Sequence, residues 1–417
     1  MSAERSAEFD VVVLGGGAAG LFAATEAAGR GSRVLLLERN KKPGVKVLAS
    51  GGSRCNVTSV LPVHVLAKHF GKTAGRFLGH AFKALPPTAI VQLLHDEGVE
   101  TYEEKFDKVF PKSNKATDVL AAFLRRFEAA GARMRCESRV EVVQRQDDGT
   151  FVVHAGADRL TTKTVVLAVG GKSYPGTGST GDGYAIAARL GHTIVTPRPA
   201  LVPLRVDEEW VKSLTGIAFQ DVEVRLVDAS GAELARRRRP LLFTHFGLSG
   251  PAAMDVSREV STRDEPTTLV VDFLPDLSAQ ELEHELDRSI EVMPTHSLSN
   301  AIEGDFPQRF LDVLFATRGV RGAQRCAEVP RAHRRVVVEL LKGARIPIAG
   351  TQDFTRAEVT VGGVALDEVD PATMQSRRVP GLYVCGEVLD VDGPIGGFNF
   401  QAAFSTGHVA GANAATR

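Results

Sequence analysis

The chain is poor in cysteine, has no surplus of either charge and contains no long hydrophobic run. Its four cysteines are far apart and form no C-x-x-C pair, which excludes a disulfide scaffold or zinc ribbon and suits a reducing compartment. With 50 basic and 50 acidic residues, it is not a globally basic nucleic-acid binder. It lacks an apolar stretch of about 18 residues and a signal-like N-terminus, so we expect a cytoplasmic protein without membrane or metal.

Glycine, in contrast, is abundant and clustered, with 41 glycines among 417 residues. The first cluster follows an apolar strand predicted over Phe9–Leu14 and opens a small-residue helix predicted over 18–28. A second strand is predicted over 33–37 and ends at Glu38. Together these elements form one βαβ unit, and their uniformly apolar strands are typical of a parallel, doubly wound sheet.

The first cluster contains the G-x-G-x-x-G spacing of dinucleotide-binding turns. Gly15 would permit the tight turn, Gly17 a close approach to a pyrophosphate, and Gly20 close packing of helix on strand. Glu38, at the end of the second strand, could accept hydrogen bonds from ribose hydroxyls. The alternative is a glycine-rich turn in an α/β protein that binds no nucleotide.

A second match to the spacing, Gly176-x-Gly178-x-x-Gly181, follows an apolar strand predicted over 164–169. It could be a separate NAD(P) fingerprint. Residues 173–175 lengthen the connection, however, and no strand ending in an acid follows at the right distance. This favours a loop of the same cofactor domain.

A third element near the C-terminus points to a flavin. The predicted strand over 380–385 runs into Gly386 and Glu387, a pattern that could deliver a carboxylate to a ribityl chain. Gly397 then opens a small-residue helix predicted to run to about 415, whose N-terminus could face the flavin pyrimidine and favour the reduced anion. An enzyme that uses NAD alone has no need of this element, so FAD is the expected cofactor.

The pattern of predicted secondary structure changes near residue 198. We predict an α/β fold: a discontinuous Rossmann-type FAD-binding domain with an inserted small β-barrel and a helical subdomain. Its expected parts are residues 1–197 and 355–417 for the FAD domain, 198–275 with 346–354 for the barrel, and 276–345 for the helical insert. Ser278 and Glu281 form a capping box at the start of that insert.

Four segments closely resemble the BaiN/RdsA family of FAD-dependent oxidoreductases. They are Lys46–Thr58, which contains S-G-G-S-R-C-N, then Gly178–Tyr184, Phe243–Pro251 and Gly386–Gly393. The resemblance extends over nearly the whole chain. It departs at Ser53, where the family loop has glycine, which would cost about 1 kcal/mol or more if that position needs a positive φ.

The resemblance implies a Rossmann-type FAD domain interrupted by a barrel and a helical insert, and enzymes that add hydride to activated C=C bonds. Members act on uridine in 23S ribosomal RNA, giving dihydrouridine, or on oxo-steroid bile-acid intermediates. NADH or NADPH is the expected transient electron donor. The residues expected to hold FAD are Gly15, Gly17, Ala18, Ala19, Gly20, Glu38, Arg39, Lys46, Ser50, Gly51, Asn56, Val140, Gly170, Gly386, Glu387, Gly397, Phe398 and Asn399.

Three residues are candidates for catalysis. Cys55 could deliver a proton to the substrate α carbon, or be a buried structural thiol. Arg54 could hold a substrate carbonyl or phosphate, or pair with the FAD pyrophosphate. His245, in the Phe-Thr-His-Phe-Gly turn, could be an acid, an orienting group or a structural histidine.

Two basic segments bear on the substrate. Arg236, Arg237, Arg238 and Arg239 are consecutive, and residues Arg309–Arg345 carry nine basic and three acidic side chains. Together they could grip RNA phosphates, whereas the alternative is a pair of solvated faces. We therefore favour an RNA uridine reductase over a small-molecule, steroid-type enone reductase. A flavin oxidase or redox sensor is the remaining alternative.

Overall fold

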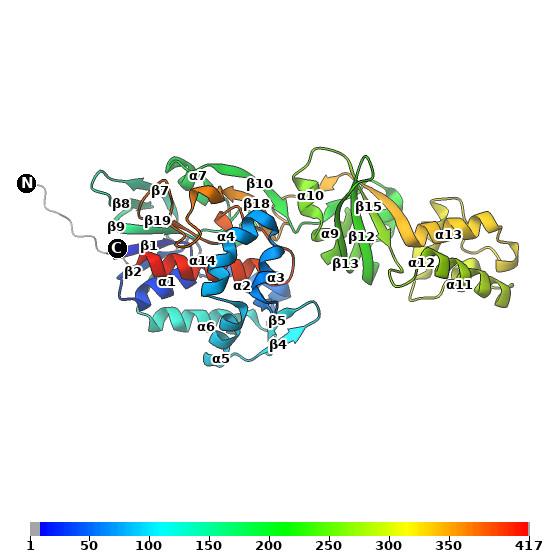
Figure 1. Cartoon of the computed structure of the whole chain (residues 1–417), viewed down its shortest axis with the longest axis horizontal. Helices are drawn as coiled ribbons and strands as arrows, with labels where there is room; N and C mark the ends of the chain where they lie inside the picture. Colours follow the sequence, from blue (N-terminus) through cyan, green and yellow to red (C-terminus); the bar gives the residue numbers. More distant parts are fainter. Residues whose placement is uncertain (1–8, 416–417) are drawn as a thin grey trace, which may run out of the picture. The chain divides into compact units, whose positions relative to one another are not determined.

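The computed structural model describes residues 9–415, which divide into two compact units (Figure 1). The first unit combines the chain up to Arg198 with the chain from Glu358 onward. The second unit is Pro199–Ala357. The expected limits of the insertion, 198 and 354, lie close to these.

A seven-stranded sheet forms the centre of the first unit. Its strands are β1 (Phe9–Leu14), β2 (Val34–Leu37), β6 (Arg133–Arg135), β7 (Val140–Arg145), β8 (Phe151–Ala155), β9 (Asp158–Leu167) and β19 (Leu382–Val384). The order is β6-β2-β1-β9-β8-β7, with β19 also on β9. The pairs among β6, β2, β1, β9 and β19 are parallel, and β1 and β2 are almost wholly buried, as expected for strands covered on both faces.

The C-terminal segment completes this sheet. On one side, β9 pairs with β1; on the other, its first half pairs with β8 and its second half with β19. Tyr383 therefore lies opposite Val166, although more than 200 residues separate them in the chain. The FAD-type domain is discontinuous, as predicted.

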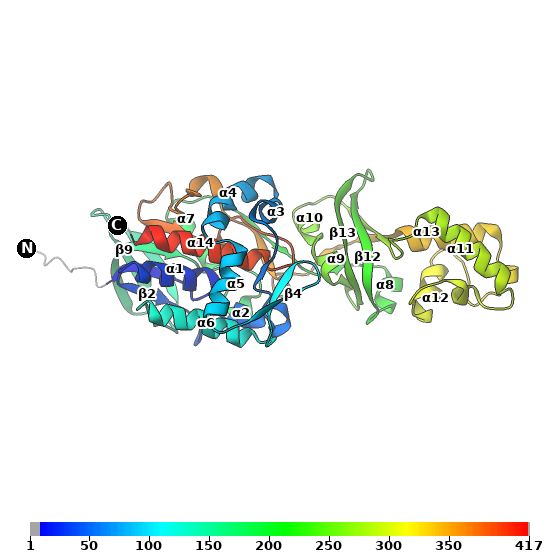
Figure 2. The ribbon, with the colours of Figure 1, turned by 60° about the horizontal axis from the view of Figure 1, so that its bottom comes forward.

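Within residues 9–415, eight α-helices belong to the first unit. They are α1 (Ala18–Gly29), α2 (Val45–Ser53), α3 (Val63–Lys68), α4 (Gly71–Ala84), α5 (Pro87–Asp96), α6 (Ala116–Ala129), α7 (Asp182–Arg189) and α14 (Phe398–Ala414). Helices α1 and α14 lie side by side (Figures 1 and 2). Cβ atoms added at Gly407 and Gly411 would lie 2.3 Å and 2.2 Å from the carbonyl oxygens of Ala19 and Ala23, so glycine makes this close contact possible.

Two small sheets complete the first unit. Their strands are β3 (Thr58–Ser59), β4 (Thr101–Glu104), β5 (Lys108–Pro111), β10 (Ile194–Ala200) and β18 (Val359–Val364). The first sheet has the order β3-β5-β4, and its pairs are antiparallel. The second consists of β10 and β18.

A second seven-stranded sheet forms the centre of the second unit. Its strands are β11 (Leu204–Arg205), β12 (Ala218–Asp228), β13 (Glu233–Thr244), β14 (Gly247–Ser249), β15 (Thr267–Asp272), β16 (Ala344–Ile348) and β17 (Gly350–Thr351). The order is β16-β15-β12-β13-β14-β11-β17. The two end strands, β16 and β17, are separated by Ala349 alone, so one continuous segment closes the sheet into the predicted barrel.

Helices accompany the barrel in the second unit. They are α8 (Glu209–Ser213), α9 (Pro251–Met254), α10 (Ser257–Ser261), α11 (Ala279–Val292), α12 (Gln308–Ala316) and α13 (Arg331–Gly343). Phe219 and Phe273 of the barrel contact Phe310 of α12 with ring centroids 4.7 Å and 4.8 Å apart. The capping box of Ser278 and Glu281 is confirmed. Within residues 9–415, no helix is long and apolar enough to cross a membrane.

Candidate cofactor and active site

The first glycine motif forms the turn between β1 and α1. Gly15 has φ +98°, and a Cβ there would lie 2.6 Å from the carbonyl oxygen of Ala168. A Cβ at Gly20 would lie 1.8 Å from the oxygen of Gly15, so glycine alone lets helix and strand approach this closely. At Gly17, in contrast, no described atom lies within 4 Å of the Cβ position. This open space suits a ligand that approaches the backbone.

The N-terminus of α1 has the chemistry of a phosphate site. Gly17 is its N-cap, no described side chain caps it, and its first turn contains no acidic residue. The first N–H groups of a helix lack intrahelical acceptors and favour an anion. Ala18 and Ala19 lie in that turn. The residues present therefore fit the pyrophosphate of FAD.

Glu38 lies at the end of β2 and is buried. Its two carboxylate oxygens accept hydrogen bonds from the backbone N–H groups of Gly16 and Asn40, both at 2.7 Å. These contacts fix the carboxylate beside the glycine turn, and each oxygen keeps a second lone pair for a hydroxyl. The position fits the predicted ribose contact.

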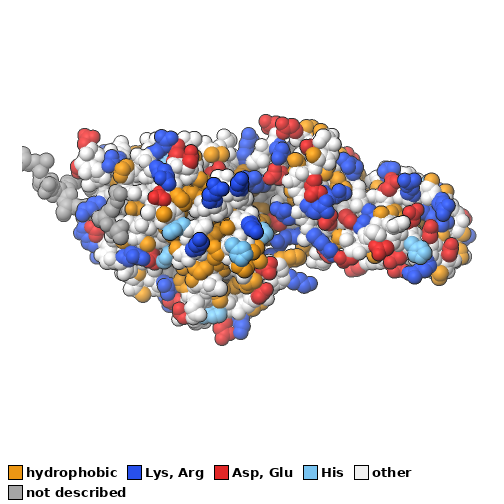
Figure 3. Space-filling view, viewed as in Figure 1, with side chains coloured by type: hydrophobic (Ala, Val, Ile, Leu, Met, Phe, Trp, Pro, Cys, Tyr) orange, Lys and Arg blue, Asp and Glu red, His pale blue; other side chains and the backbone are white. Residues whose placement is uncertain are grey.

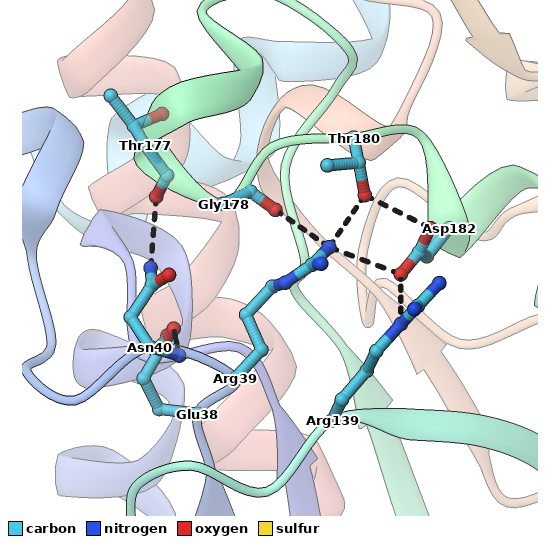
Figure 4. Close-up of polar contacts among 8 residues, drawn as sticks. All are labelled: Glu38, Arg39, Asn40, Arg139, Thr177, Gly178, Thr180 and Asp182. Carbon is cyan, nitrogen blue, oxygen red and sulfur yellow. Dashed lines mark hydrogen bonds and ion pairs between the residues drawn. The ribbon is translucent and has the colours of Figure 1, made fainter.

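The second glycine motif packs against the end of β2 (Figure 4). Arg39 donates to the oxygen of Gly178 at 3.3 Å and to Thr180 Oγ1 at 2.6 Å, and its Nη1 lies 3.1 Å from Asp182. Asn40 Nδ2 donates to the oxygen of Thr177 at 2.9 Å. The motif is thus a loop of the first unit held to the first βαβ unit, as favoured from the sequence.

The segment around Cys55 has an unusual backbone. Helix α2 is interrupted at residues 50–52, where Gly51 and Gly52 have φ +55° and +66°. Ser53 and Cys55 follow with φ +67° and +62°. Ser53 thus occupies the positive φ at which the family loop has glycine, which carries a strain of about 1 kcal/mol or more.

The thiol of Cys55 is completely buried. Burial raises its pKa to about 12, although a hydrogen bond with Ser50 lowers it somewhat. The backbone N–H of Cys55 donates to the oxygen of Ser50 at 3.1 Å. The side chain therefore keeps its proton at neutral pH, which suits a proton donor and not a nucleophile.

Asn56 joins this loop to the N-terminus of α14. With its amide turned so that the oxygen faces α14, it accepts from the N–H of Gly397 at 2.9 Å and donates to the oxygens of Thr58 and Val109. Gln401 accepts from Thr58 Oγ1 at 2.6 Å. Two predicted cofactor elements, more than 300 residues apart in the chain, therefore meet here. Sequence reasoning missed Gln401, whose apolar neighbours give no indication of this contact.

A polar network surrounds Glu387 and consists of Lys46, Ser173 and Thr360. Lys46 Nζ lies 3.0 Å from Glu387 Oε2 and donates to Ser173 Oγ at 2.9 Å. Ser173 Oγ and the backbone N–H of Thr360 donate to Glu387 Oε1 at 2.8 Å and 2.9 Å. Lys46 thus neutralises a carboxylate close to the predicted flavin element. Ser173 and Thr360 were missed, because only the fold brings their distant segments together.

The other predicted cofactor residues lie in the same unit. Asn399 bonds through its side chain to the N–H and oxygen of Gly393, both at 2.8 Å, and Phe398 is buried beside it in the first turn of α14. Val140 is buried at the start of β7. Cβ atoms at Gly170 and Gly386 would lie 3.1 Å from Ser179 Oγ and 2.7 Å from Ala19 Cβ.

Arg54 pairs with a residue that the sequence did not suggest. Its Nη1 lies 2.7 Å from Glu104 Oε2 and 3.5 Å from the hydroxyl of Tyr102, and its guanidinium lies 4.1 Å above the centroid of the Phe110 ring. The bond to Arg54 lowers the pKa of Glu104. The β4–β5 strand pair therefore positions Arg54, and neither predicted role of this arginine is tested by these contacts.

His245 belongs to the second unit, on the turn between β13 and β14. Its ring is exposed and contacts the ring of Phe246 edge to face, with centroids 5.0 Å apart. This contact does not distinguish a role in the site from a structural role. A role in the reaction stays a prediction.

The four consecutive arginines do not form one positive patch. They lie on β13, where successive side chains point to opposite faces. Arg236 pairs with Glu223 and Glu233, and Arg238 with Asp221 and Asp276, at 2.6–3.0 Å. The expected joint grip on phosphates is weakened because these carboxylates neutralise the charge.

Some basic side chains of the segment 309–345 are also paired with acids. Arg334 lies 2.9 Å from Asp287 of the acidic helix α11, and Lys342 lies 2.7 Å from Asp272. Figure 3 shows acidic and basic side chains interspersed over α11, α12 and α13. Within the described part of the chain, no group of three or more His, Cys, Asp or Glu side chains could hold a metal ion.

Known proteins of similar sequence cover almost the whole chain. The family model described as "HI0933-like protein Rossmann domain" matches residues 9–413. A ribosomal RNA dihydrouridine synthase of Escherichia coli is 32% identical, over 95% of this chain and 96% of the relative. A 3-dehydro-bile acid delta(4,6)-reductase of Clostridium scindens is 29% identical, over 97% of this chain and 98% of the relative.

The fold is also similar to that of two solved ketosteroid dehydrogenases. The 3-ketosteroid-delta4-(5alpha)-dehydrogenase of Rhodococcus jostii has a TM-score of 0.50 at 17% identity, covering 100% of this chain and 99% of its own. The 3-ketosteroid delta1-dehydrogenase of Sterolibacterium denitrificans also has a TM-score of 0.50, at 14% identity, covering 98% of this chain and 99% of its own. At these identities the likeness concerns the fold alone.

Proposed function

This chain belongs to the HI0933-like family, and on that premise we propose that it is an FAD-dependent reductase of an activated C=C bond. Its proposed substrate is uridine in 23S ribosomal RNA, and its product dihydrouridine. One observation carries the proposal: Asn56 joins the Cys55 loop to the N-terminus of α14, in the unit that also contains the β1–α1 glycine turn. The loop that could act on substrate is thus fixed to the predicted flavin element.

The residues that would hold FAD divide by the part of the cofactor they face. Gly15, Gly17 and the N-terminus of α1 would bind the pyrophosphate, and Glu38 a ribose. The N-terminus of α14 would stabilise negative charge on the flavin ring. Lys46 balances the charge of Glu387, so this carboxylate does not oppose that stabilisation.

The remaining chemistry would fall to side chains of the Cys55 loop. Bound FAD would supply hydride for the β carbon of the enone-like substrate, with NADH or NADPH as the source of electrons. Cys55 would hold the proton for the α carbon, since its raised pKa keeps the thiol protonated. Arg54 would donate to the substrate carbonyl oxygen as negative charge develops there.

The choice of substrate is supported by two relatives. The synthase of Escherichia coli is joined by a ribosomal RNA dihydrouridine synthase of Haemophilus influenzae, 31% identical over 95% of this chain and 96% of the relative. A small-molecule enone is the second candidate, because the bile-acid reductase matches almost as well and the arginines of β13 are paired. A flavin oxidase or redox sensor is the third.

The decisive experiment measures nucleosides of 23S ribosomal RNA by mass spectrometry in cells with and without this gene. We expect dihydrouridine to be lost on deletion and restored by the wild type and by Gly29→Ala, but not by Gly17→Val. An unchanged profile would overturn the RNA reductase, and flavin reoxidation by enones would then test the second candidate. Failure of NADH and NADPH to bleach the bound flavin would favour the third.

The role of Cys55 has a separate test. Cys55→Ala should keep FAD and lower turnover tenfold or more, because tenfold corresponds to about 1.4 kcal/mol of barrier. Cys326→Ala, a buried cysteine of the second unit, is the control. Unchanged turnover in Cys55→Ala would remove this thiol from the mechanism.

A further inference from the structure

One stretch of the first unit carries positive charge without negative charge. Aspartate and glutamate make up 50 of the 417 residues, yet residues 39–95 contain neither of them, together with nine lysines and arginines. This stretch runs from the end of β2 into α5 and includes the Cys55 loop. Its charge is therefore not compensated by its own sequence, and compensation would have to come from segments that pack against it.

Four basic side chains of this stretch lie on one face of α4. Lys72, Arg76, His80 and Lys83 follow one another at intervals of four, four and three residues, which places them on the same side of the helix. All four are exposed, whereas the large apolar side chains of α4 are buried. These four residues are named the α4 stripe. Figure 3 shows basic and histidine side chains over α3 and α4.

The α4 stripe is not paired with acids. Within residues 9–415, no hydrogen bond or ion pair joins any of its four side chains to another side chain. Helices α3 and α14, which pack against α4, contain no acidic residue. Lys72 and Arg76 lie one turn apart, so their like charges repel each other unless an anion lies beside them. The arginines of β13, in contrast, are held by carboxylates.

Both ends of α4 are attached to the first turn of α14. The ring of Phe70, directly before α4, contacts the ring of Phe398, with centroids 6.3 Å apart. At the other end, Gln401 Nε2 donates to the oxygen of Leu85 at 2.8 Å. Since α14 is also joined to the Cys55 loop, the α4 stripe belongs to the same framework as the candidate active site.

We propose that the α4 stripe binds the phosphate backbone of the ribosomal RNA that carries the target uridine. Lysine and arginine contacts to phosphates supply affinity and fix the position of a bound nucleic acid, whatever its sequence. The balanced charge of the whole chain does not oppose this binding, because an uncompensated face attracts an anion locally. This inference rests on the proposed RNA function.

An anionic membrane is the other large surface that a basic helix could meet. A helix that lies on a membrane presents large apolar side chains next to its basic ones, so that they can enter the lipid. No large apolar side chain of α4 is exposed. The α4 stripe therefore suits phosphates in solution better than a lipid surface.

The test uses full-length holoenzyme and three probes: 23S ribosomal RNA from the deletion strain, a fluorescein-labelled single-stranded oligouridine, and vesicles that contain phosphatidylglycerol. The triple variant Lys72→Gln/Arg76→Gln/Lys83→Gln should raise the KM for ribosomal RNA about tenfold or more, with FAD content and flavin reduction unchanged. Its oligouridine affinity should depend less on salt, with a slope of log K against log salt that is shallower by about 2. Lys72→Arg/Arg76→Lys/Lys83→Arg keeps the charge and should stay within about twofold of wild type.

A matched control removes the same charge from another part of the first unit. Arg145→Gln/Arg159→Gln/Lys163→Gln changes exposed positions of β7 and β9 and should leave the KM within about twofold of wild type. An equal effect of the two glutamine triples would overturn the proposal, because it would show attraction by overall charge and not contact at the α4 stripe.

The remaining outcomes separate this inference from the proposed function. If wild type forms dihydrouridine and the α4 glutamine variant matches it in KM and salt dependence, the stripe proposal is overturned while the RNA function stands. Loss of vesicle binding with an unchanged KM would assign α4 to a membrane and also overturn it. If wild type forms no dihydrouridine in ribosomal RNA, the proposed function fails and this inference fails with it. If the triple variant loses FAD, Arg76→Gln alone decides, with a slope shallower by about 0.7 expected.

Discussion

Residues 15–20 and 176–181 contain the same glycine spacing but differ in what surrounds the middle glycine. The Cβ position of Gly17 faces open space, and its φ of −83° is available to any residue. The Cβ position of Gly178 lies 2.5 Å from Asn40 Nδ2, and its φ is +100°. The spacing alone therefore indicates tight turns, and the space at the middle glycine distinguishes a turn that can bind a ligand from one packed against protein.

The largest effect is expected at the third glycine of the first motif. Gly20→Ala places a methyl group 1.8 Å from a backbone oxygen, which should cost about 3 kcal/mol or more of unfolding free energy. Gly176→Ala, in the second motif, meets no described atom within 4 Å and should change it by less than about 0.5 kcal/mol. Urea unfolding followed by circular dichroism measures both. Equal effects would contradict the contrast.

The single tryptophan provides an internal control for such experiments. Trp210 lies in the second unit, so its fluorescence reports that unit. Variants of the glycine turns should leave the unfolding transition seen by tryptophan fluorescence in place. The part of the far-ultraviolet circular dichroism transition that arises from the first unit should move to lower urea. A joint shift of both would show that the two units unfold together.

Substitutions of the middle glycine of each motif should separate loss of FAD binding from loss of protein stability. Gly17→Val fills the open space and should abolish most FAD binding with little change in the fold, whereas Gly29→Ala in the same helix should keep FAD. Gly178→Ala should instead keep FAD and lose about 1–2 kcal/mol, since the new Cβ meets Asn40 at a positive φ. The ratio of flavin to protein absorbance distinguishes the two. Gly17→Val with normal flavin content would remove this turn from the cofactor site.

The stability of the second glycine motif should also depend on pH through Asp182, which directly follows the motif at the start of α7. Burial opposes the charge of Asp182, but hydrogen bonds from Thr180 and Arg139 outweigh it and lower its pKa below the usual value. The carboxylate therefore contributes stability above that value, and the contribution is lost as the pH falls through the lowered pKa. Asp182→Asn should cost up to about 1 kcal/mol at pH 7. That difference from wild type should shrink below about pH 4, and a constant difference would argue against Asp182.

The smallest change in stability is expected at Ser53, where the family loop has glycine. Ser53 has φ +67°, so Ser53→Gly should relieve strain and stabilise the protein by up to about 1 kcal/mol, reduced by the entropy glycine adds to the unfolded chain. Ser32→Gly, at a half-buried serine after α1, is a control in which no stabilisation is expected. A destabilised Ser53→Gly variant would show that the serine side chain contributes more than the strain it causes.

The sequence predicts the elements whose chemistry is local. The β1–α1 turn, the acid at the end of β2 and the start of α14 are recognisable because each is set by neighbours in the chain. Ser173, Thr360 and Gln401 could not be predicted, because their partners Glu387 and Thr58 come from distant segments. Most of the pairing of the arginines on β13 was missed for the same reason: Glu223 and Asp221 lie on the adjacent strand β12, and only Glu233 is close to the run in the sequence.

Because β19 pairs with β9, the central sheet of the first unit cannot be completed until the end of the chain has been synthesised. A ribosome completes Pro199–Ala357 before it has made β19 or α14, so the closed barrel and its helices can form while the central sheet still lacks a strand and a covering helix. Domains generally fold as units during translation, usually from the N-terminus onward. Here the middle of the chain is the first part that can be finished, and the nucleotide-type domain, although it begins first, must wait for the last 60 residues.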